Sequence, residues 1–127
     1  MAQVRGIGGI FFKSEHPEAL RAWYGKHLGI DSGPGGKMFA WRDQDDPTRE
    51  NFTVWSIFPA STDYFNPSKS PLMMNYIDDY LHGTLAALKA EGVTVADKVE
   101  ECDYGKFGWI FDPDGNKIEL WEPPPRS

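Results

Sequence analysis

The chain has 127 residues, a formal net charge of −6 at pH 7 and one cysteine. Its length suits a single domain spanning 1–127, and its acidic balance argues against nucleic acid as a partner. One cysteine cannot form an intrachain disulfide, which fits a reducing compartment, and no apolar run approaches the roughly 20 residues of a membrane span. We therefore expect a cytoplasmic protein with no membrane partner.

The first half is expected to form a strand, a helix and then further strands. The glycine-rich segment from Val4 to Lys13 is predicted to be a strand, and its glycines do not follow the G-x-G-x-x-G spacing of a nucleotide site. Pro17 suits the first turn of an amphipathic helix, and Gly29 suits its end. Two more strands are expected at 37–42 and 51–58.

The second half repeats this order after a turn-rich connector at 60–70. A strand is expected at 72–77, followed by a helix that Asp78 or Asp79 caps and Gly92 ends. A strand at 93–99 follows. The loop at 100–106 contains a glycine and several polar residues, which suits a mobile rim over the pocket mouth.

The closing segment predicts a β-hairpin. Asp112-Pro113-Asp114-Gly115-Asn116 is turn chemistry between two runs of strand-forming residues. Alternation in the second strand places Ile118 and Leu120 on one face, with Lys117, Glu119 and Trp121 on the other. A carboxylate in mid-strand beside a tryptophan calls for a chemical explanation.

An internal repeat relates the two halves. Adding 64 to the numbers of the first half carries the strand at 7–13 onto 71–77, and Pro59 onto Pro123. The predicted organisation is module one at about 1–60, the connector, module two at about 70–123, and a proline-rich tail at 123–127. Helices on one side of the strands leave the other face of the sheet to be covered or concave.

The repeated βαβββ order resembles the vicinal oxygen chelate superfamily. Trp23-Tyr24 followed by Leu28-Gly29 carries the resemblance, as does the closing run from Asp112 to Trp121. This superfamily includes glyoxalase I, bleomycin-resistance proteins, extradiol dioxygenases, methylmalonyl-CoA epimerase and fosfomycin-resistance enzymes. The resemblance implies an α+β fold in which two modules form one concave mixed sheet with helices outside. Because members commonly dimerise, it also leaves a homodimer open.

Enzymes of this superfamily typically hold a divalent metal on the concave face. The ligands are usually His or Gln from the first strand of each module and Glu from the last strand. Glu119 matches the last ligand and is the only matching position. Gly9, Leu72 or Met73, and Trp55 stand at the other positions, and the three histidines fall on the predicted helices. We expect no complete metal site and no cofactor, with a divalent metal at Glu119 as the alternative.

Strand parity, with Glu119 as its reference, predicts the residues that line the concave face. They are Gly9, Phe11, Trp55, Leu72, Met74, Tyr76, Trp109, Glu119 and Trp121. The registers of the first and fifth strands are open by one residue, and such a slip exchanges the two faces. The set describes an aromatic and sulfur-rich cavity with one carboxylate, a composition typical of a small-molecule site.

Glu119 has three interpretations that the sequence leaves open. It could form an ion pair with a lysine or arginine, accept a hydrogen bond from a ligand, or act as a catalytic base or metal ligand. A base would need a pKa that burial has raised. The favoured function is that of a metal-free binder of a small apolar or aromatic molecule, similar to the bleomycin-resistance proteins. The alternative is a metal-dependent lyase, isomerase or dioxygenase, so whether the protein is an enzyme is open.

Overall fold

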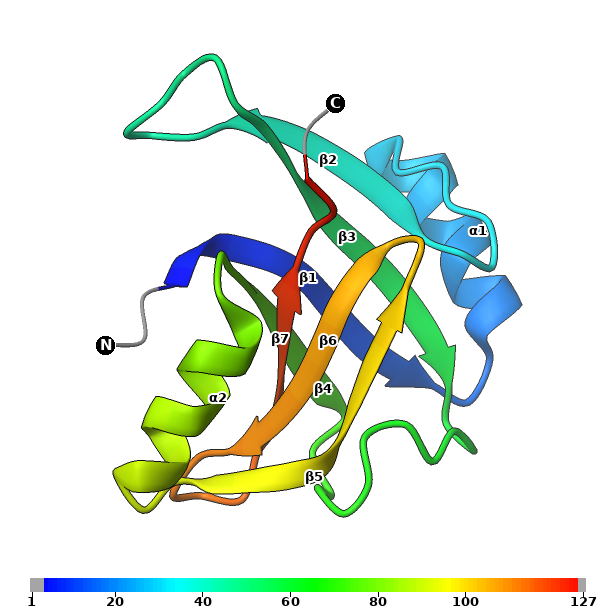
Figure 1. Cartoon of the computed structure of the whole chain (residues 1–127). Coiled ribbons are helices and arrows are strands. Elements are labelled where there is room, and N and C mark those ends of the chain that lie inside the picture. The colour runs from blue at the N-terminus through cyan, green and yellow to red at the C-terminus, as the bar shows by residue number, and fades with distance from the viewer. Residues whose placement is uncertain (1–3, 126–127) are drawn as a thin grey trace. The chain divides into compact units, whose positions relative to one another are not determined.

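The computed structural model describes residues 4–125. Within this range the chain forms two helices and seven strands, the α+β fold that the sequence predicts (Figure 1). In chain order the elements are β1 (Val4–Ser14), α1 (Pro17–Leu28), β2 (Lys37–Arg42), β3 (Glu50–Pro59), β4 (Leu72–Asp78), α2 (Leu81–Ala90), β5 (Thr94–Cys102), β6 (Gly105–Phe111) and β7 (Lys117–Glu122). Neither described helix is long and apolar enough to cross a membrane.

Contacts divide the chain into two compact units. The N-terminal unit consists of residues 9–73, and the C-terminal unit combines residues 74 onwards with the start of β1, up to Gly8. The C-terminal half has the predicted strand–helix–three-strand order. In the first half, two strands and an isolated bridge between Gly33 and Gly36 follow the helix. β1 therefore contributes residues to both units.

In the N-terminal unit the strands lie in the order β2-β3-β1, with β3 antiparallel to β2 and parallel to β1. Pro17 begins α1, and Gly29 ends it in the left-handed conformation, with φ 68°. Aromatic side chains join the helix to the strands, since Tyr24 lies 4.9 Å from Trp55 and 6.2 Å from Phe12 between ring centroids. These edge-to-face contacts fix α1 against β3 and β1.

The segment predicted as a connector is part of the core of the N-terminal unit. Phe65 is fully buried, and its ring lies 5.3 Å from that of Phe58, which in turn lies 5.5 Å from Phe11. The ammonium group of Lys13 lies over the Phe65 ring at 5.0 Å. The chain between β3 and β4 therefore packs against the sheet instead of only linking the two halves.

In the C-terminal unit the strands lie in the order β4-β7-β6-β5. β4 runs parallel to β7, and the other two pairs are antiparallel. Helix α2 covers one face through a cluster of Leu81, Leu85 and Leu120. Gly108 on β6 makes this close approach possible, because a Cβ there would lie 2.8 Å from a Leu85 methyl group.

Two carboxylates secure the start of α2. The helix begins one residue after Tyr80, so the expectation that Asp78 or Asp79 is its N-cap is wrong. Asp78 instead accepts hydrogen bonds from the Tyr80 N–H at 2.7 Å and the Thr84 hydroxyl at 2.6 Å. Glu122, at the end of β7, accepts one from the Leu81 N–H at 2.9 Å. These contacts satisfy donors that a helix N-terminus leaves open.

The closing turn has the predicted hairpin form. Asp112 Oδ1 accepts hydrogen bonds from the Asp114 and Asn116 N–H groups, and Oδ2 accepts one from the Asn116 amide. The hydrogen bond from the Asn116 side chain is the main cause that lowers the pKa of Asp112, and backbone N–H donors of the turn add to it. β6 and β7 then pair in register, with Trp109 opposite Glu119.

Candidate functional site

Glu119 is a buried carboxylate at the centre of a polar row across three strands. Strand pairing places Asn75 of β4 on one side of it and Trp109 of β6 on the other. The Asn75 amide donates to Glu119 Oε1 at 2.5 Å, and the Trp109 indole N–H donates to Oε2 at 3.0 Å. Glu119 and Asn75 are each 2% exposed and Trp109 is 4% exposed. Burial of a charge requires such donors, because they replace the water that it loses.

Glu119 points away from α2. Its neighbours Ile118 and Leu120 both pack with the leucine cluster beneath that helix. Side chains alternate along a strand, so Glu119 lies on the opposite face of the sheet. Within the C-terminal unit the carboxylate thus occupies the face that no helix of this unit covers.

Gly8 is needed for the orientation of Asn75. A carboxylate accepts hydrogen bonds only, so the amide nitrogen must face Glu119 and the amide oxygen must point away. That oxygen is buried and has no hydrogen-bond partner within residues 4–125. A Cβ at Gly8 would collide with it and would also lie 2.9 Å from Ile77 and from the Trp121 ring. The absence of a side chain at Gly8 thus leaves room for the neighbouring Asn75 amide.

Aromatic side chains flank Glu119 on both neighbouring rungs of the β6–β7 ladder. Phe107 lies opposite Trp121, and their rings are parallel within 3° at a centroid separation of 6.1 Å. On the other side Lys117 pairs with Phe111 and holds its ammonium group 5.5 Å from the Trp109 ring. This face, which we call the Glu119 face, consists of Asn75, Phe107, Trp109, Phe111, Lys117, Glu119 and Trp121.

The turn before β6 is held to this face and is not the long rim loop that the sequence suggests. β5 continues to Cys102 and β6 begins at Gly105, so only two residues separate the strands. The Trp121 indole N–H donates to the Tyr104 carbonyl at 2.8 Å. Gly105 has φ 122°, which suits glycine, and a Cβ there would crowd the Trp121 indole nitrogen. The expected loop at 100–106 is therefore corrected to a tight hairpin.

Among the predicted site residues of the C-terminal unit, Trp109, Glu119 and Trp121 share the Glu119 face. Tyr76 does not, because it pairs with Leu120 and packs against the leucine cluster. Met74 alternates with Asn75 and therefore lies on the α2 side as well. The predicted parity of β4 is off by one residue. Asn75 was missed, although a lone amide within the apolar run of β4 was a usable signal.

The predicted residues of the N-terminal unit separate in a similar way. Trp55 packs against Tyr24 of α1 and against Phe12, so it faces the helix and not the predicted inner face. Gly9 and Phe11 alternate with Phe12 along β1 and lie on its other side. Leu72 is 43% exposed. The offset of 64 aligned Trp55 with Glu119, but two halves with little shared sequence do not fix strand parity.

The residues around Glu119 do not fit a divalent metal. Both carboxylate oxygens accept N–H donors, and neither an amide N–H nor an indole N–H can ligate a cation. Within residues 4–125 no group of three or more His, Cys, Asp or Glu is arranged to hold an ion. His27 lies against the Trp23 ring of α1, and His82 of α2 lies 3.4 Å from Glu101.

Comparison with known proteins identifies the fold. No protein-family model and no curated protein sequence matches the chain. Among solved structures, methylmalonyl-CoA epimerase from Mycobacterium tuberculosis is 16% identical with a TM-score of 0.66, covering 96% of this chain and 90% of that one. A Streptomyces coelicolor methylmalonyl-CoA epimerase variant in complex with 2-nitronate-propionyl-CoA is 14% identical with a TM-score of 0.68, covering 97% and 100%.

A third structure shows how little the fold says about activity. It is described as an NAD-dependent benzaldehyde dehydrogenase from Legionella pneumophila, and it is 12% identical with a TM-score of 0.59, covering 91% of this chain and 98% of that one. The chain thus has the fold of the methylmalonyl-CoA epimerases. That fold agrees with the resemblance seen in the sequence. Unrelated activities share folds, so the function must be argued from the site.

Proposed function

We propose that the protein binds a small apolar or aromatic molecule on the Glu119 face, without a metal ion, in the manner suggested by its resemblance to bleomycin-resistance proteins. The observation that carries this proposal is the buried Glu119 carboxylate, fixed by Asn75 and Trp109 on a sheet face rich in aromatic rings. Apolar walls with a few fixed polar groups are the usual composition of a small-molecule site.

The hydrogen bonds of Glu119 favour a binding role over a catalytic one. Both carboxylate oxygens already accept N–H donors, which hold the side chain in place between β4 and β6. The same donors occupy the positions from which a cation would approach. We infer that Glu119 shapes and polarises the site through Asn75 and Trp109, and that it neither abstracts a proton nor ligates a metal.

The partly exposed rings of Phe107 and Trp121 suggest how a ligand would be held. They lie parallel on adjacent strands beside Glu119, and a flat ring packed against them would gain both apolar contact and stacking. Lys117 adds a cation one rung beyond Glu119 on the same face. A planar molecule with a hydrogen-bonding or weakly acidic group fits this surface.

The alternative function is metal-dependent lyase, isomerase or dioxygenase chemistry with Glu119 as a ligand or base. It is supported by the match to methylmalonyl-CoA epimerases, which include complexes with methylmalonyl-CoA and with 2-nitronate-propionyl-CoA. For this chain a CoA ester is therefore the natural substrate to test. The donor set around Glu119 is the argument against it.

Metal content and ligand binding distinguish the two functions. Protein purified without chelators should carry well under one equivalent of Mn, Fe, Co, Ni or Zn, and should show no epimerase activity towards methylmalonyl-CoA when cobalt or manganese is added. A screen of planar aromatic compounds should find ligands that quench tryptophan fluorescence. Trp121→Phe should weaken their binding, whereas the control Trp23→Phe on the exposed side of α1 should not. Stoichiometric metal that Glu119→Ala removes would contradict the proposal.

We also propose that the protein acts in the cytoplasm without nucleic-acid or membrane partners. The formal charge of −6 supports the absence of a nucleic-acid partner, because phosphate backbones select basic surfaces. A homodimer remains a prediction from the resemblance. Light scattering on the purified protein measures it directly.

A further inference from the structure

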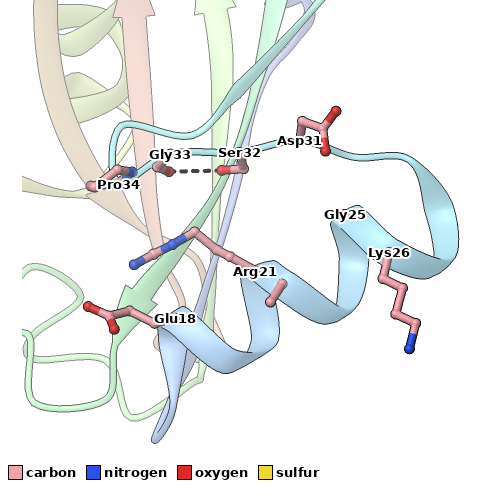
Figure 2. Close-up of a pocket in the computed structure, with 9 residues that line it drawn as sticks. Glu18, Arg21, Gly25, Lys26, Asp31, Ser32, Gly33 and Pro34 are labelled. Atoms are coloured by element: carbon pink, nitrogen blue, oxygen red, sulfur yellow. Dashed lines mark hydrogen bonds between the residues drawn. The ribbon is translucent and has the colours of Figure 1, made fainter.

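A hollow in the N-terminal unit lies between α1 and the segment that follows it, and the function proposed above gives it no role (Figure 2). Its volume is about 680 Å³, within the range of small-molecule sites. The lining residues, all from α1 and the following loop, are Glu18, Arg21, Ala22, Gly25, Lys26, Asp31, Ser32, Gly33 and Pro34. We call it the α1 hollow.

Backbone geometry holds both walls of the α1 hollow in place. Gly29, with φ 68°, turns the chain back beside the helix, and the Ile30 N–H donates to the Tyr24 carbonyl at 3.2 Å. Gly25 lets the returning loop come close, since a Cβ there would lie 3.2 Å from Asp31 Oδ1. The Gly36 N–H donates to the Gly33 carbonyl at 3.0 Å and closes the far end of the loop. The hollow is therefore built by hydrogen-bonded turns.

Arg21 lines the α1 hollow without a counter-ion among residues 4–125. It is half-buried, and its guanidinium donates one long hydrogen bond, 3.3 Å, to the Ile57 carbonyl. Within the described part of the chain it forms no ion pair. Figure 2 shows the guanidinium extending beneath the Ser32–Pro34 segment. A guanidinium carries five N–H donors, so most of those of Arg21 are available to an acceptor.

The other charges of the α1 hollow restrict what Arg21 can bind. Glu18 and Asp31 also line it, and in Figure 2 the Glu18 carboxylate lies on the same side of the helix as the guanidinium. Lys26 points away from the loop in the same view. Two carboxylates repel a doubly charged phosphate, whereas a single carboxylate next to an ammonium group complements Arg21 and Glu18 together.

We propose that the α1 hollow binds a small zwitterion, a molecule that carries one carboxylate and one ammonium group, of which free amino acids are the simplest. Arg21 binds the carboxylate through its paired N–H donors, and Glu18 binds the ammonium group. A planar fork of donors matches a carboxylate better than a point charge does, so the site uses arginine for its geometry as well as its charge. This proposal does not depend on the function proposed for the Glu119 face.

Titration followed by amide NMR tests the proposal, with glycine, 4-aminobutyrate, acetate and inorganic phosphate as probes. A zwitterion should shift the amide signals of Asp31, Ser32 and Gly33 and saturate, and both acetate and phosphate should bind more weakly. Arg21→Ala should weaken zwitterion binding by about tenfold or more, the effect of losing charged hydrogen bonds. Arg21→Gln, which keeps a donor for the Ile57 carbonyl, should weaken it as well.

Lys89→Ala is the control, because it removes an exposed cation from α2, outside the α1 hollow. It should change the affinity by less than about twofold, as expected for an exposed charge. The proposal is overturned if no probe gives saturable shifts, or if phosphate binds more tightly than the zwitterions. Equal losses for Arg21→Gln and Lys89→Ala would also overturn it, because they would indicate general attraction and no built site.

Discussion

Asn75 holds the Glu119 carboxylate and is the residue that parity arguments overlooked. Its amide donates to Glu119 at 2.5 Å, and both side chains are buried. A buried carboxylate that loses a donor must give up stability or its charge. A substitution that changes the charge of the Asn75 side chain but barely alters its shape can therefore test the hydrogen bonds around Glu119.

Replacing Asn75 with aspartate should destabilise the protein in a pH-dependent way. Asn75→Asp places a second buried carboxylate next to Glu119. At pH 7 we expect the free energy of unfolding to fall by about 3 kcal/mol or more. Repulsion raises the pKa of the pair in the folded state, so the folded protein takes up a proton. The loss should therefore grow as pH rises from the unfolded-state pKa, about 3.9, through the raised folded-state pKa.

Urea denaturation of Asn75→Asp between pH 4 and pH 8 measures this dependence. Asn75→Ala is the control, since it removes the donor without adding a charge and should lack the added slope. A flat difference between Asn75→Asp and wild type would mean that Glu119 is already protonated in the native protein. The charged hydrogen-bonded row described above would then be wrong.

Gly8 should tolerate no side chain. Its Cβ would overlap the Asn75 amide oxygen and crowd both Ile77 and Trp121. Overpacking of this kind typically costs about 1–3 kcal/mol, and we expect that loss for Gly8→Ala in chemical denaturation. Gly35→Ala is the matched control, because a Cβ at Gly35 meets nothing within 4 Å. Equal stability of the two variants would show that β1 moves aside at no cost.

At the scale of elements, α2 depends on a carboxylate that precedes it by several residues. Asp78 is 2% exposed and accepts hydrogen bonds from the Tyr80 N–H and the Thr84 hydroxyl. Asp78→Ala should lower the free energy of unfolding by roughly 2 kcal/mol, since it removes the acceptor of the Tyr80 N–H and leaves the buried Thr84 hydroxyl unpaired. Asp97→Ala, at an exposed position of β5, should stay within about 0.5 kcal/mol of wild type. Thermal or urea unfolding compares them.

The turn of the closing hairpin should make the stability of the wild-type protein depend on pH, with a sign opposite to that expected for Asn75→Asp. Hydrogen bonds from Asn116 and the turn backbone lower the pKa of Asp112 below its ordinary value of 3.8. A carboxyl with a lowered folded-state pKa stabilises the protein above its unfolded-state pKa, and this stability is lost as pH falls through the folded-state value. Below about pH 4 the Asp112 carboxyl of the wild-type protein becomes protonated and its contribution to stability is lost. Asp112→Asn should therefore lose less stability over this range.

The effect at Asp112 will be small, because the carboxyl is only half-buried and water screens its interactions. Urea midpoints measured from pH 2.5 to pH 6 for wild type and Asp112→Asn give the difference in slope. Asp114→Asn in the same turn is the control, since no hydrogen bond to its side chain contributes. If both variants change the slope equally, the cause is net charge and not the turn.

At the scale of the molecule, hydrophobic periodicity and turn residues predicted most of the helices and strands. The predicted sheet faces of individual side chains were wrong where the strand register was weakly determined. Pro17, Gly29 and the Asp112 turn act through local backbone physics, so the sequence reveals them. The faces of Tyr76 and Trp55 depend on strand register, which partners set and which one residue reverses. Glu119 was recognised as unusual, but its partner Asn75 lies 44 residues away and becomes evident only when β4 and β7 pair.

The two units share β1, and this has a consequence for unfolding. The strand runs from Val4 to Ser14, and its residues divide between the units after Gly8. Each unit contains one part of β1. If β1 is released when one unit unfolds, the other unit loses its part of the strand as well. Because folding of each part requires this common strand, we expect one cooperative transition, as is usual for a chain of this size.

Core truncation in one unit should therefore destabilise the other. Leu85 belongs to the leucine cluster of the C-terminal unit, and Leu85→Ala should cost about 2–5 kcal/mol. Native-state hydrogen exchange should then show a similar loss of protection for slowly exchanging amides of β7 and of β3. The reciprocal variant Phe65→Ala, in the core of the N-terminal unit, should affect both strands in the same way. If Leu85→Ala weakens only β7, while β3 keeps its protection, the units unfold separately and β1 does not couple them.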